Sequence, residues 1–137
     1  MNRKTELAEG KECCFAHNVQ ITMRDGVKLA TTIYLPPTRG PFPVVLVRTA
    51  YNRSGFYDPF FIKNKMALVV QDCRGRYGSE GKFYPFINEP KDGVDTLKWI
   101  GSQSWCNGRV GMFGDSYLAA TQLLLAPEKN KLLKTIN

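Results

Sequence analysis

The first clear pattern along the chain is an alternation of apolar and polar residues in "NVQITMRDGVKLATTIYLPP". A period of two is typical of a strand that has one buried face and one exposed face. The two alternating runs flank Asp25-Gly26, and Asp-Gly between such runs is a strong hairpin signal. We therefore predict two antiparallel strands, over about 18–23 and 28–35, the second ended by Pro36-Pro37.

Farther along, the apolar residues come in continuous runs instead. Two of these runs are "PVVLVRTA" (43–50) and "ALVVQDC" (67–73), and "RVGMFG" (109–114) is a shorter one. Strands of a parallel sheet, buried on both faces, are typically continuous in this way. The last residues, "NKLLKTIN", indicate the start of a further strand.

Two other stretches predict helices. In "NEPKDGVDTLKWIGSQ" a proline stands near the start, and apolar residues recur three apart from Val94 to Ile100. The segment 116–126 is apolar on nearly every side, which is typical of a helix buried against a sheet. Pro127 is expected to end this second helix.

The predicted order is hairpin, strand, crossover, strand, helix, strand, helix. This order is typical of a right-handed, doubly wound α/β fold preceded by an antiparallel edge. We expect one domain over 1–137, with a peripheral lead-in at 1–15. A parallel sheet that ended in the middle of a strand would leave an apolar edge uncovered. We therefore expect the sequence to be the front part of something longer.

Composition narrows the function classes. The net charge is +7, but Lys and Arg are scattered without a basic run, so we expect a solvated basic surface and no nucleic-acid partner. We see no apolar signal region and no run long enough to span a membrane, and expect neither. The spacing of the four cysteines matches no zinc-binding pattern, and we expect no metal and no cofactor. We expect the cysteines to be reduced thiols in a cytoplasmic protein. They are Cys13, Cys14, Cys73 and Cys106.

The stretch "GRVGMFGDSYLAATQ" carries the candidate chemistry. It reads as a strand, a tight turn with Ser116 at its tip, and a helix. A nucleophile elbow needs a small residue such as Gly114 where strand and helix approach, and the helix N-terminus offers N–H groups to an oxyanion. Because Leu118 occupies the usual second glycine position, spacing alone leaves open a serine that merely caps the helix.

Several segments together resemble the cocaine esterase / X-prolyl dipeptidyl-peptidase (CocE/NonD) family of α/β-hydrolases. The resemblance spans about 18–136 and rests on five ordered motifs: "VQITMRDGVKLATTIYLP", "PFPVVLVRTAYNR", "VVQDCRGRYGSEGKFYPF", "DGVDTLKWIGSQSWCNGRVGMFG" and "GRVGMFGDSYLAATQ". It implies the N-terminal portion of an α/β-hydrolase fold, truncated after the nucleophile helix, without the cap or the C-terminal β domain. Ala119 stands where the family has glycine.

The resemblance also implies the site residues. Ser116 would be the acyl-accepting nucleophile, with the backbone N–H of Tyr117 and the phenol of Tyr51 as oxyanion donors. The alternative for Tyr51 is a loop aromatic that packs on the surface. Asp115 is expected to be a charge in the first helical turn.

Three other charged residues follow the strand over 67–73. Asp72, Arg74 and Glu80 are interpreted as a structural ion-pair network. "GRYGSEG" lacks the Gly-Lys-Ser/Thr ending of a phosphate-binding loop.

The triad of this fold runs Ser, then Asp or Glu, then His along the chain. The single histidine, His17, precedes the first predicted strand, so we expect both partners of Ser116 to lie after residue 137. The resemblance implies a serine hydrolase acting on a small ester or an X-Pro peptide, inactive as these residues alone. The alternative is a non-catalytic truncated product, or a half-domain whose partner chain supplies Asp and His.

Overall fold

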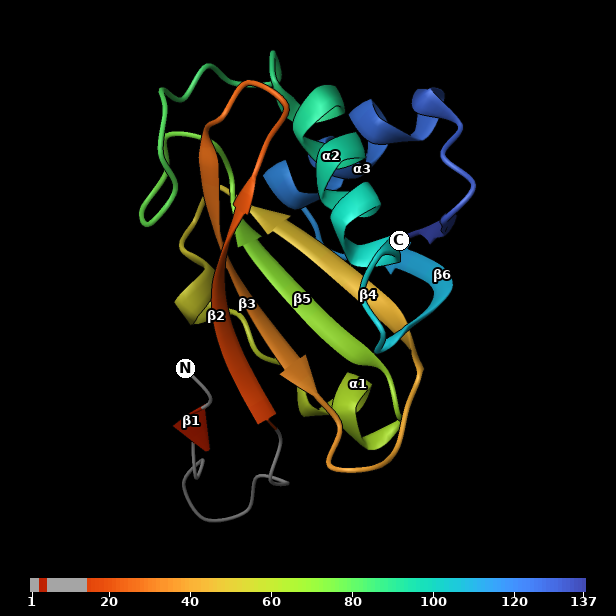
Figure 1. Ribbon diagram of the computed structural model, residues 1–137. Coiled ribbons are helices and arrows are strands. Elements are labelled where there is room, and N and C mark those ends of the chain that lie inside the picture. Colours follow the sequence, from red (N-terminus) through yellow and green to blue (C-terminus); the bar gives the residue numbers. More distant parts are fainter. Residues whose placement is uncertain (1–2, 5–14) are drawn as a thin grey trace.

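The computed structural model describes residues 3–4 and 15–137, and their strands form one mixed sheet in the order β1-β2-β3-β5-β4-β6-β7 (Figure 1). The neighbours from β1 to β5 are antiparallel, and those from β5 to β7 are parallel. The α/β class with a leading antiparallel hairpin is therefore confirmed. The strands are β1 (Arg3–Lys4), β2 (Phe15–Thr22), β3 (Lys28–Leu35), β4 (Phe42–Thr49), β5 (Ala67–Asp72), β6 (Cys106–Met112) and β7 (Leu133–Ile136).

The predicted hairpin is β2 and β3, joined through Asp25-Gly26. Gly26 has φ +88°, a left-handed conformation that favours glycine at the turn. The pairing closes at Thr22 opposite Lys28. Strand β2 begins at Phe15, three residues before the predicted start, because it pairs with β3 along the whole length of that strand.

Two of the continuous apolar runs, β4 and β5, are strands buried on both faces, as predicted. The third, β6, differs, because only Val110 and Met112 are buried there and they lie on the same face. In β4, Val44 and Leu46 belong to one core cluster, and Val45 and Val47 belong to the cluster on the other face. This division follows the alternation of side chains along a strand. The first cluster also contains residues of α2 and the end of α3, and the second contains residues of α1 and the start of α3.

Three α-helices accompany the sheet in the described part of the chain: α1 (Pro59–Lys63), α2 (Glu89–Gly101) and α3 (Tyr117–Leu125). Helices α2 and α3 lie side by side, and α1 lies at the other end of the parallel strands (Figure 1). Short 3₁₀ turns cover Arg53–Gly55 and Ala126–Glu128. Helix α3 ends at Leu125, before Pro127, as predicted, and the second 3₁₀ turn follows it.

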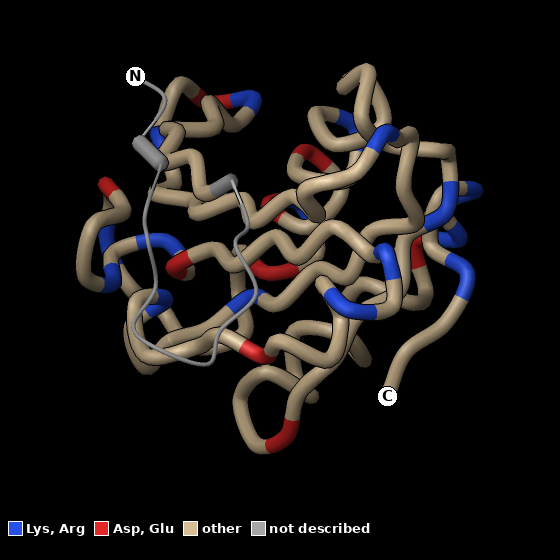
Figure 2. The backbone as a smooth tube through the Cα atoms, turned by 90° about the horizontal axis from the view of Figure 1, so that it is seen from below, with Lys and Arg blue, Asp and Glu red and all other residues tan. Residues whose placement is uncertain are grey.

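The ends of the sheet extend the sequence-based picture. Strand β7 confirms the strand predicted in the last residues, and β1 pairs with β2 within the stretch expected to be a peripheral lead-in. The remainder of that lead-in lies outside the described residues. In the described part of the chain, no helix combines the length and apolar character needed to cross a membrane. In the described part of the chain, Lys and Arg are spread over several places and do not gather in one patch (Figure 2).

Candidate active site

The candidate site lies at the carboxyl end of β6, where the chain turns sharply into α3. Gly114 has φ +129°, which side-chain-bearing residues rarely adopt. A Cβ atom at this position would lie 2.5 Å from Cδ2 and 2.6 Å from Cβ of Leu118. The turn therefore requires glycine at 114, as the strand–turn–helix interpretation predicted.

Ser116 sits at the tip of this turn in a strained conformation, with φ 53° and ψ −126°. It occupies the N-cap position of α3, but its side chain makes no capping hydrogen bond. The interpretation of Ser116 as a mere helix cap is therefore wrong. Its hydroxyl is instead 3.0 Å from the phenol oxygen of Tyr51.

Tyr51 lies in the loop after β4, and that loop is held by local bonds. The N–H of Tyr51 donates to Oγ1 of Thr49 at 2.9 Å, and the following residue, Asn52, has φ 81°. Tyr51 is 56% exposed as a residue, but its hydroxyl faces the elbow. The backbone N–H of Tyr117 donates to that hydroxyl oxygen at 3.4 Å. The structure thus brings Ser116, Tyr51 and Tyr117 together.

This arrangement brings two groups that can donate hydrogen bonds close to the hydroxyl oxygen of Ser116. The N–H of Tyr117 belongs to the first residue of α3, where helix N–H groups have no partner within the helix. The Tyr51 O–H approaches from a different loop. Donors fixed in advance around a reacting carbonyl stabilise the negative charge that develops on its oxygen.

The single histidine of the chain lies far from this site. His17 is in β2, and four strand-to-strand steps separate β2 from β6. At roughly 4.8 Å per step, the separation across the sheet is about 19 Å. The structure therefore agrees with the expectation that His17 is not the base for Ser116.

Asp115 differs from its prediction. It precedes the N-cap residue and so lies outside the first turn of α3. Its backbone carbonyl accepts the N–H groups of Leu118 and Ala119 at 3.0 and 3.3 Å. The sharp elbow shifts the helix start to Tyr117, which is why Asp115 falls before the helix.

The loop that carries Tyr51 is anchored by Asp72, which is fully buried at the end of β5. Its two carboxylate oxygens accept the backbone N–H of Arg53 at 2.7 Å and the guanidinium of Arg53 at 2.6 Å. The second oxygen also accepts the N–H of Gly78. This ion pair fixes the chain two residues after Tyr51, and sequence reasoning missed the partner.

Arg74 and Glu80 form separate contacts, so the single network predicted for Asp72, Arg74 and Glu80 is wrong. Arg74 bridges Asp25 in the hairpin and Asp92 in α2, each at 2.7 Å. The hydrogen bonds that Arg74 donates to the carboxylates of Asp92 and Asp25 raise the pKa of Arg74. Glu80 instead accepts the backbone N–H of Lys28. Each residue binds a segment distant in sequence, and a local motif does not reveal such partners.

A buried ion pair lies below the site. Arg48, in the apolar run of β4, donates to Oε2 of Glu89 at 2.6 Å, and the two side chains are 0% and 2% exposed. Arg48 also donates to Oε1 of Gln71 at 2.7 Å. Burial is the largest single effect and would lower the pKa of Arg48, but the charges of Glu89, Cys73 and Asp92 and the hydrogen bond to Glu89 together raise that pKa. An arginine within an apolar strand was the sequence signal that could have indicated this pair.

Gln122, a buried polar residue of α3, braces the elbow from behind. Its amide nitrogen donates to the carbonyl of Gly114 at 2.9 Å and to that of Asn137 at 3.1 Å. Its carbonyl oxygen accepts the N–H of Asn137. One amide side chain therefore connects the turn before Ser116 to the end of β7.

Two of the four cysteines, Cys73 and Cys106, lie in the described part of the chain. Cys73 is buried and Cys106 is partly buried, and both are free thiols. Burial, together with the nearby Glu89 carboxylate, raises the pKa of Cys73 to about 12. Cys13 and Cys14 lie outside the described residues. Within residues 3–4 and 15–137, no cluster of His, Cys, Asp or Glu is arranged to hold a metal ion.

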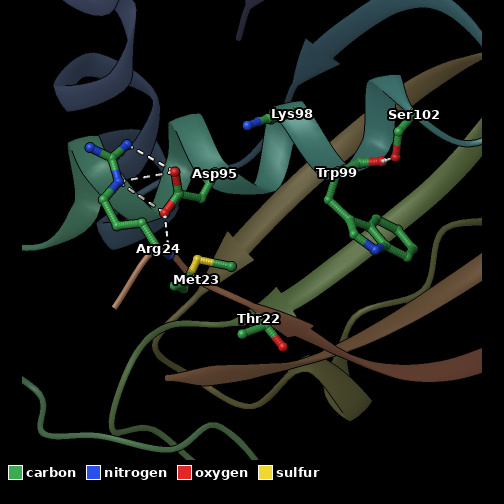
Figure 3. A pocket seen from close by; sticks show the side chains of 7 residues that line it. All are labelled: Thr22, Met23, Arg24, Asp95, Lys98, Trp99 and Ser102. Carbon is green, nitrogen blue, oxygen red and sulfur yellow. Dashed lines mark hydrogen bonds and ion pairs between the residues drawn. The ribbon is translucent and has the colours of Figure 1, made fainter. Parts of the chain in front are cut away.

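A separate cavity of about 340 Å³ lies where the end of β2 meets α2 (Figure 3). Arg24 and Asp95 face each other at its rim, joined by an ion pair of 2.8 Å, and Trp99 and Ser102 extend the wall along α2. None of the residues around the elbow lines this cavity.

The sequence of this chain is similar to those of known hydrolases. The family model of the X-Pro dipeptidyl-peptidases (S15 family) matches residues 25–137. The cocaine esterase of Rhodococcus sp. (strain MB1 Bresler) is 46% identical over 118 residues, which are 78% of this chain and 20% of that protein. The chain therefore spans about a fifth of the length of this curated relative.

Solved structures extend the likeness to the backbone. An alpha-amino acid ester hydrolase is 31% identical with a TM-score of 0.84, over 98% of this chain and 26% of that one. A CocE/NonD family hydrolase from Staphylococcus aureus is 28% identical with a TM-score of 0.86, over 91% of this chain and 27% of that one. With its α/β-hydrolase fold and its sequence match, the chain belongs to the X-Pro dipeptidyl-peptidase (S15) family of hydrolases.

Proposed function

We propose that Ser116 is the nucleophile of a serine hydrolase that cleaves an ester or an X-Pro peptide bond through an acyl-enzyme. The observation that carries the proposal is the geometry at the elbow. Ser116 is exposed on a strained turn, and its hydroxyl makes no hydrogen bond to the N-terminus of α3. This hydroxyl lies 3.0 Å from the Tyr51 hydroxyl, and the N–H of Tyr117 donates to the same phenol oxygen. Strain of this kind persists where the surrounding structure fixes it, and it concentrates at functional sites.

In the proposed reaction, Oγ of Ser116 attacks the carbonyl carbon of the substrate and gives its proton to a base. The carbonyl oxygen becomes an oxyanion that accepts hydrogen bonds from the N–H of Tyr117 and the O–H of Tyr51. The C–O or C–N bond to the leaving group then breaks, and the leaving group takes up the proton. Water attacks the acyl-serine in the same manner and releases the acid.

The base in this proposal is a histidine oriented by an aspartate, both outside residues 1–137. A serine hydroxyl without a base is a weak nucleophile, and His17 lies about 19 Å away across the sheet. We therefore propose that residues 1–137 alone have little or no turnover. Of the two bonds, the ester is the first to test, because the relatives named above include two ester hydrolases.

The test uses the longest polypeptide that contains residues 1–137 in frame, beside residues 1–137 alone. Both receive a p-nitrophenyl ester and an X-Pro p-nitroanilide. We expect turnover by the longer polypeptide, and we expect Ser116→Ala to lower it at least about 1,000-fold. The matched control is Ser104→Ala, an exposed serine in the turn before β6. Turnover that survives Ser116→Ala would refute the proposal.

The same assay tests the alternative of a half-domain. If the in-frame polypeptide is inactive and turnover appears only when a second chain is added, Asp and His come from that partner. If no polypeptide that contains residues 1–137 has hydrolase activity, the proposed function is wrong and the elbow is inherited geometry.

A further inference from the structure

The side chain of Tyr117 is held more firmly than an oxyanion donor requires, since that role uses only its backbone. The hydroxyl of Tyr117 donates to Oε1 of Glu89 at 3.2 Å and accepts the backbone N–H of Phe86 at 3.0 Å. The ring stacks on Phe86, with centroids 5.4 Å apart, and meets Phe83 at 5.6 Å. These contacts fix the ring at its edge, its face and its hydroxyl.

Glu89 divides its two carboxylate oxygens between two elements. Oε1 accepts the Tyr117 hydroxyl, and Oε2 accepts Nη1 of Arg48 at 2.6 Å. Glu89 is also the first residue of α2, where a negative charge is favoured by the helix dipole. The position of the Glu89 carboxylate is thus fixed by the buried Arg48 cation and by the helix that carries it, independently of the contact with Tyr117.

Arg48 connects the same cluster to the other oxyanion donor. It lies in β4, three residues before Tyr51, and its Nε is fixed by Gln71 in the neighbouring strand. The chain of contacts therefore runs from the end of β4 through Arg48 and Glu89 to the Tyr117 hydroxyl. Both donors near Ser116 are attached to one buried cluster.

We propose that Glu89, held by Arg48, is a positioning residue for the oxyanion hole: it fixes the Tyr117 hydroxyl and thereby the direction of the Tyr117 backbone N–H. The inference rests on the proposed function of Ser116. Burial and the Glu89 charge raise the pKa of the Tyr117 hydroxyl to about 12, so it remains a donor to Glu89 at neutral and mildly alkaline pH.

The cleanest perturbation is Tyr117→Phe. It removes only the hydroxyl and keeps the ring that stacks on Phe86, and it leaves the Arg48–Glu89 pair intact. Losing a whole oxyanion donor lowers kcat about 10²–10³-fold, so misdirecting one is expected to lower kcat about tenfold. We expect KM to change less than about twofold, because the donor acts on the transition state. The matched control is Tyr84→Phe, which alters an exposed tyrosine in the loop before α2.

Two further measurements separate positioning from a general structural effect. Phenylboronic acid forms a tetrahedral adduct on a reactive serine. In Tyr117→Phe we therefore expect its inhibition constant to rise by about the factor by which kcat falls. In a double-mutant cycle, Glu89→Gln should lower kcat in the wild-type background and have little further effect in Tyr117→Phe. If Glu89→Gln does not fold, the kcat and KM of Tyr117→Phe alone determine whether the inference holds.

The outcomes are distinct from those of the functional test. If Ser116→Ala abolishes turnover but Tyr117→Phe keeps the kcat of the wild type, the inference is wrong and the proposed function stands. If Tyr117→Phe raises KM with kcat unchanged, Tyr117 contributes to substrate binding and the inference is also wrong. If Ser116→Ala leaves turnover intact, the proposed function fails, and the inference fails with it.

Discussion

Gly114 gives the sharpest quantitative prediction for the elbow. In Gly114→Ala, the new Cβ would meet Cδ2 and Cβ of Leu118 at 2.5 and 2.6 Å, distances that real Cβ atoms essentially never show. Leu118 is 6% exposed, and its Cβ is fixed to the backbone of α3, so rotation of the side chain does not relieve the clash. Overpacking of this kind costs about 1–3 kcal/mol.

The backbone conformation adds a second cost. An alanine at φ +129° occupies a region that is nearly restricted to glycine, which costs roughly 1–3 kcal/mol. The two costs sum to about 2–6 kcal/mol, against a total stability of about 5–15 kcal/mol for a typical protein. Gly114→Ala is therefore expected to remove a large part of the stability or to displace the elbow.

Gly108→Ala is the matched control. Gly108 also has a positive φ, +86°, but a Cβ there would have no heavy atom within 4 Å. This variant incurs only the backbone cost, about 1–2 kcal/mol. Urea unfolding of both variants and the wild type, with ester turnover measured on the same samples, separates packing from strain. Equal stabilities for Gly114→Ala and Gly108→Ala, with full turnover in both, would refute the close approach at the elbow.

Three further predictions concern other parts of the chain. Tyr51→Phe should lower kcat about 10²–10³-fold through loss of one oxyanion donor, and Tyr77→Phe, at another exposed tyrosine, should not; equal rates would contradict the role of Tyr51. Because burial raises the pKa of Cys73 to about 12, iodoacetamide at pH 8 should alkylate Cys73 only after unfolding, as peptide mass spectrometry would show; labelling of the native protein would contradict its burial. Burial disfavours the charged form of Asp95, but the hydrogen bonds and charge of Arg24 outweigh burial and lower the pKa of Asp95. The ion pair between Arg24 and Asp95 therefore stabilises the fold above pH about 4, and this stabilisation is lost as the pH falls through the lowered pKa. Arg24→Gln should therefore lower the melting temperature at pH 7 and make a smaller difference at pH 3; a difference independent of pH would contradict this assignment.

The fold was largely predictable because its signals are local. Alternation indicated the strands β2 and β3, and continuous apolar runs indicated β4 and β5, which are buried on both faces. For β3 the alternation predicted one exposed face, and this was wrong: residues 29–33 are all buried, the two threonines included, so both faces of β3 are covered there. Boundaries were less predictable where pairing decides them. Strand β6 begins at Cys106, three residues before the predicted start at Arg109, because Cys106 pairs with Phe42 of β4. The two residues between Cys106 and Arg109 are an asparagine and a glycine, which gave no strand signal.

The site divides in the same way. Gly114, Ser116 and the Tyr117 N–H lie within four residues of one another, so one short motif indicated all three. Tyr51 came only from the family resemblance, because it lies 65 residues from Ser116. The Arg48–Glu89 pair spans 41 residues, and no periodic pattern joins its members. The usual preference of charged residues for the surface also argued against it.

The most direct test of the central claim is to find where a fluorophosphonate probe attaches. The polypeptide that contains residues 1–137 in frame and shows ester turnover is incubated with the probe, digested and analysed by peptide mass spectrometry. The account predicts one adduct, on the peptide that contains Ser116, together with loss of turnover in proportion to labelling. An adduct on a different residue, or complete loss of turnover without an adduct on Ser116, would contradict it.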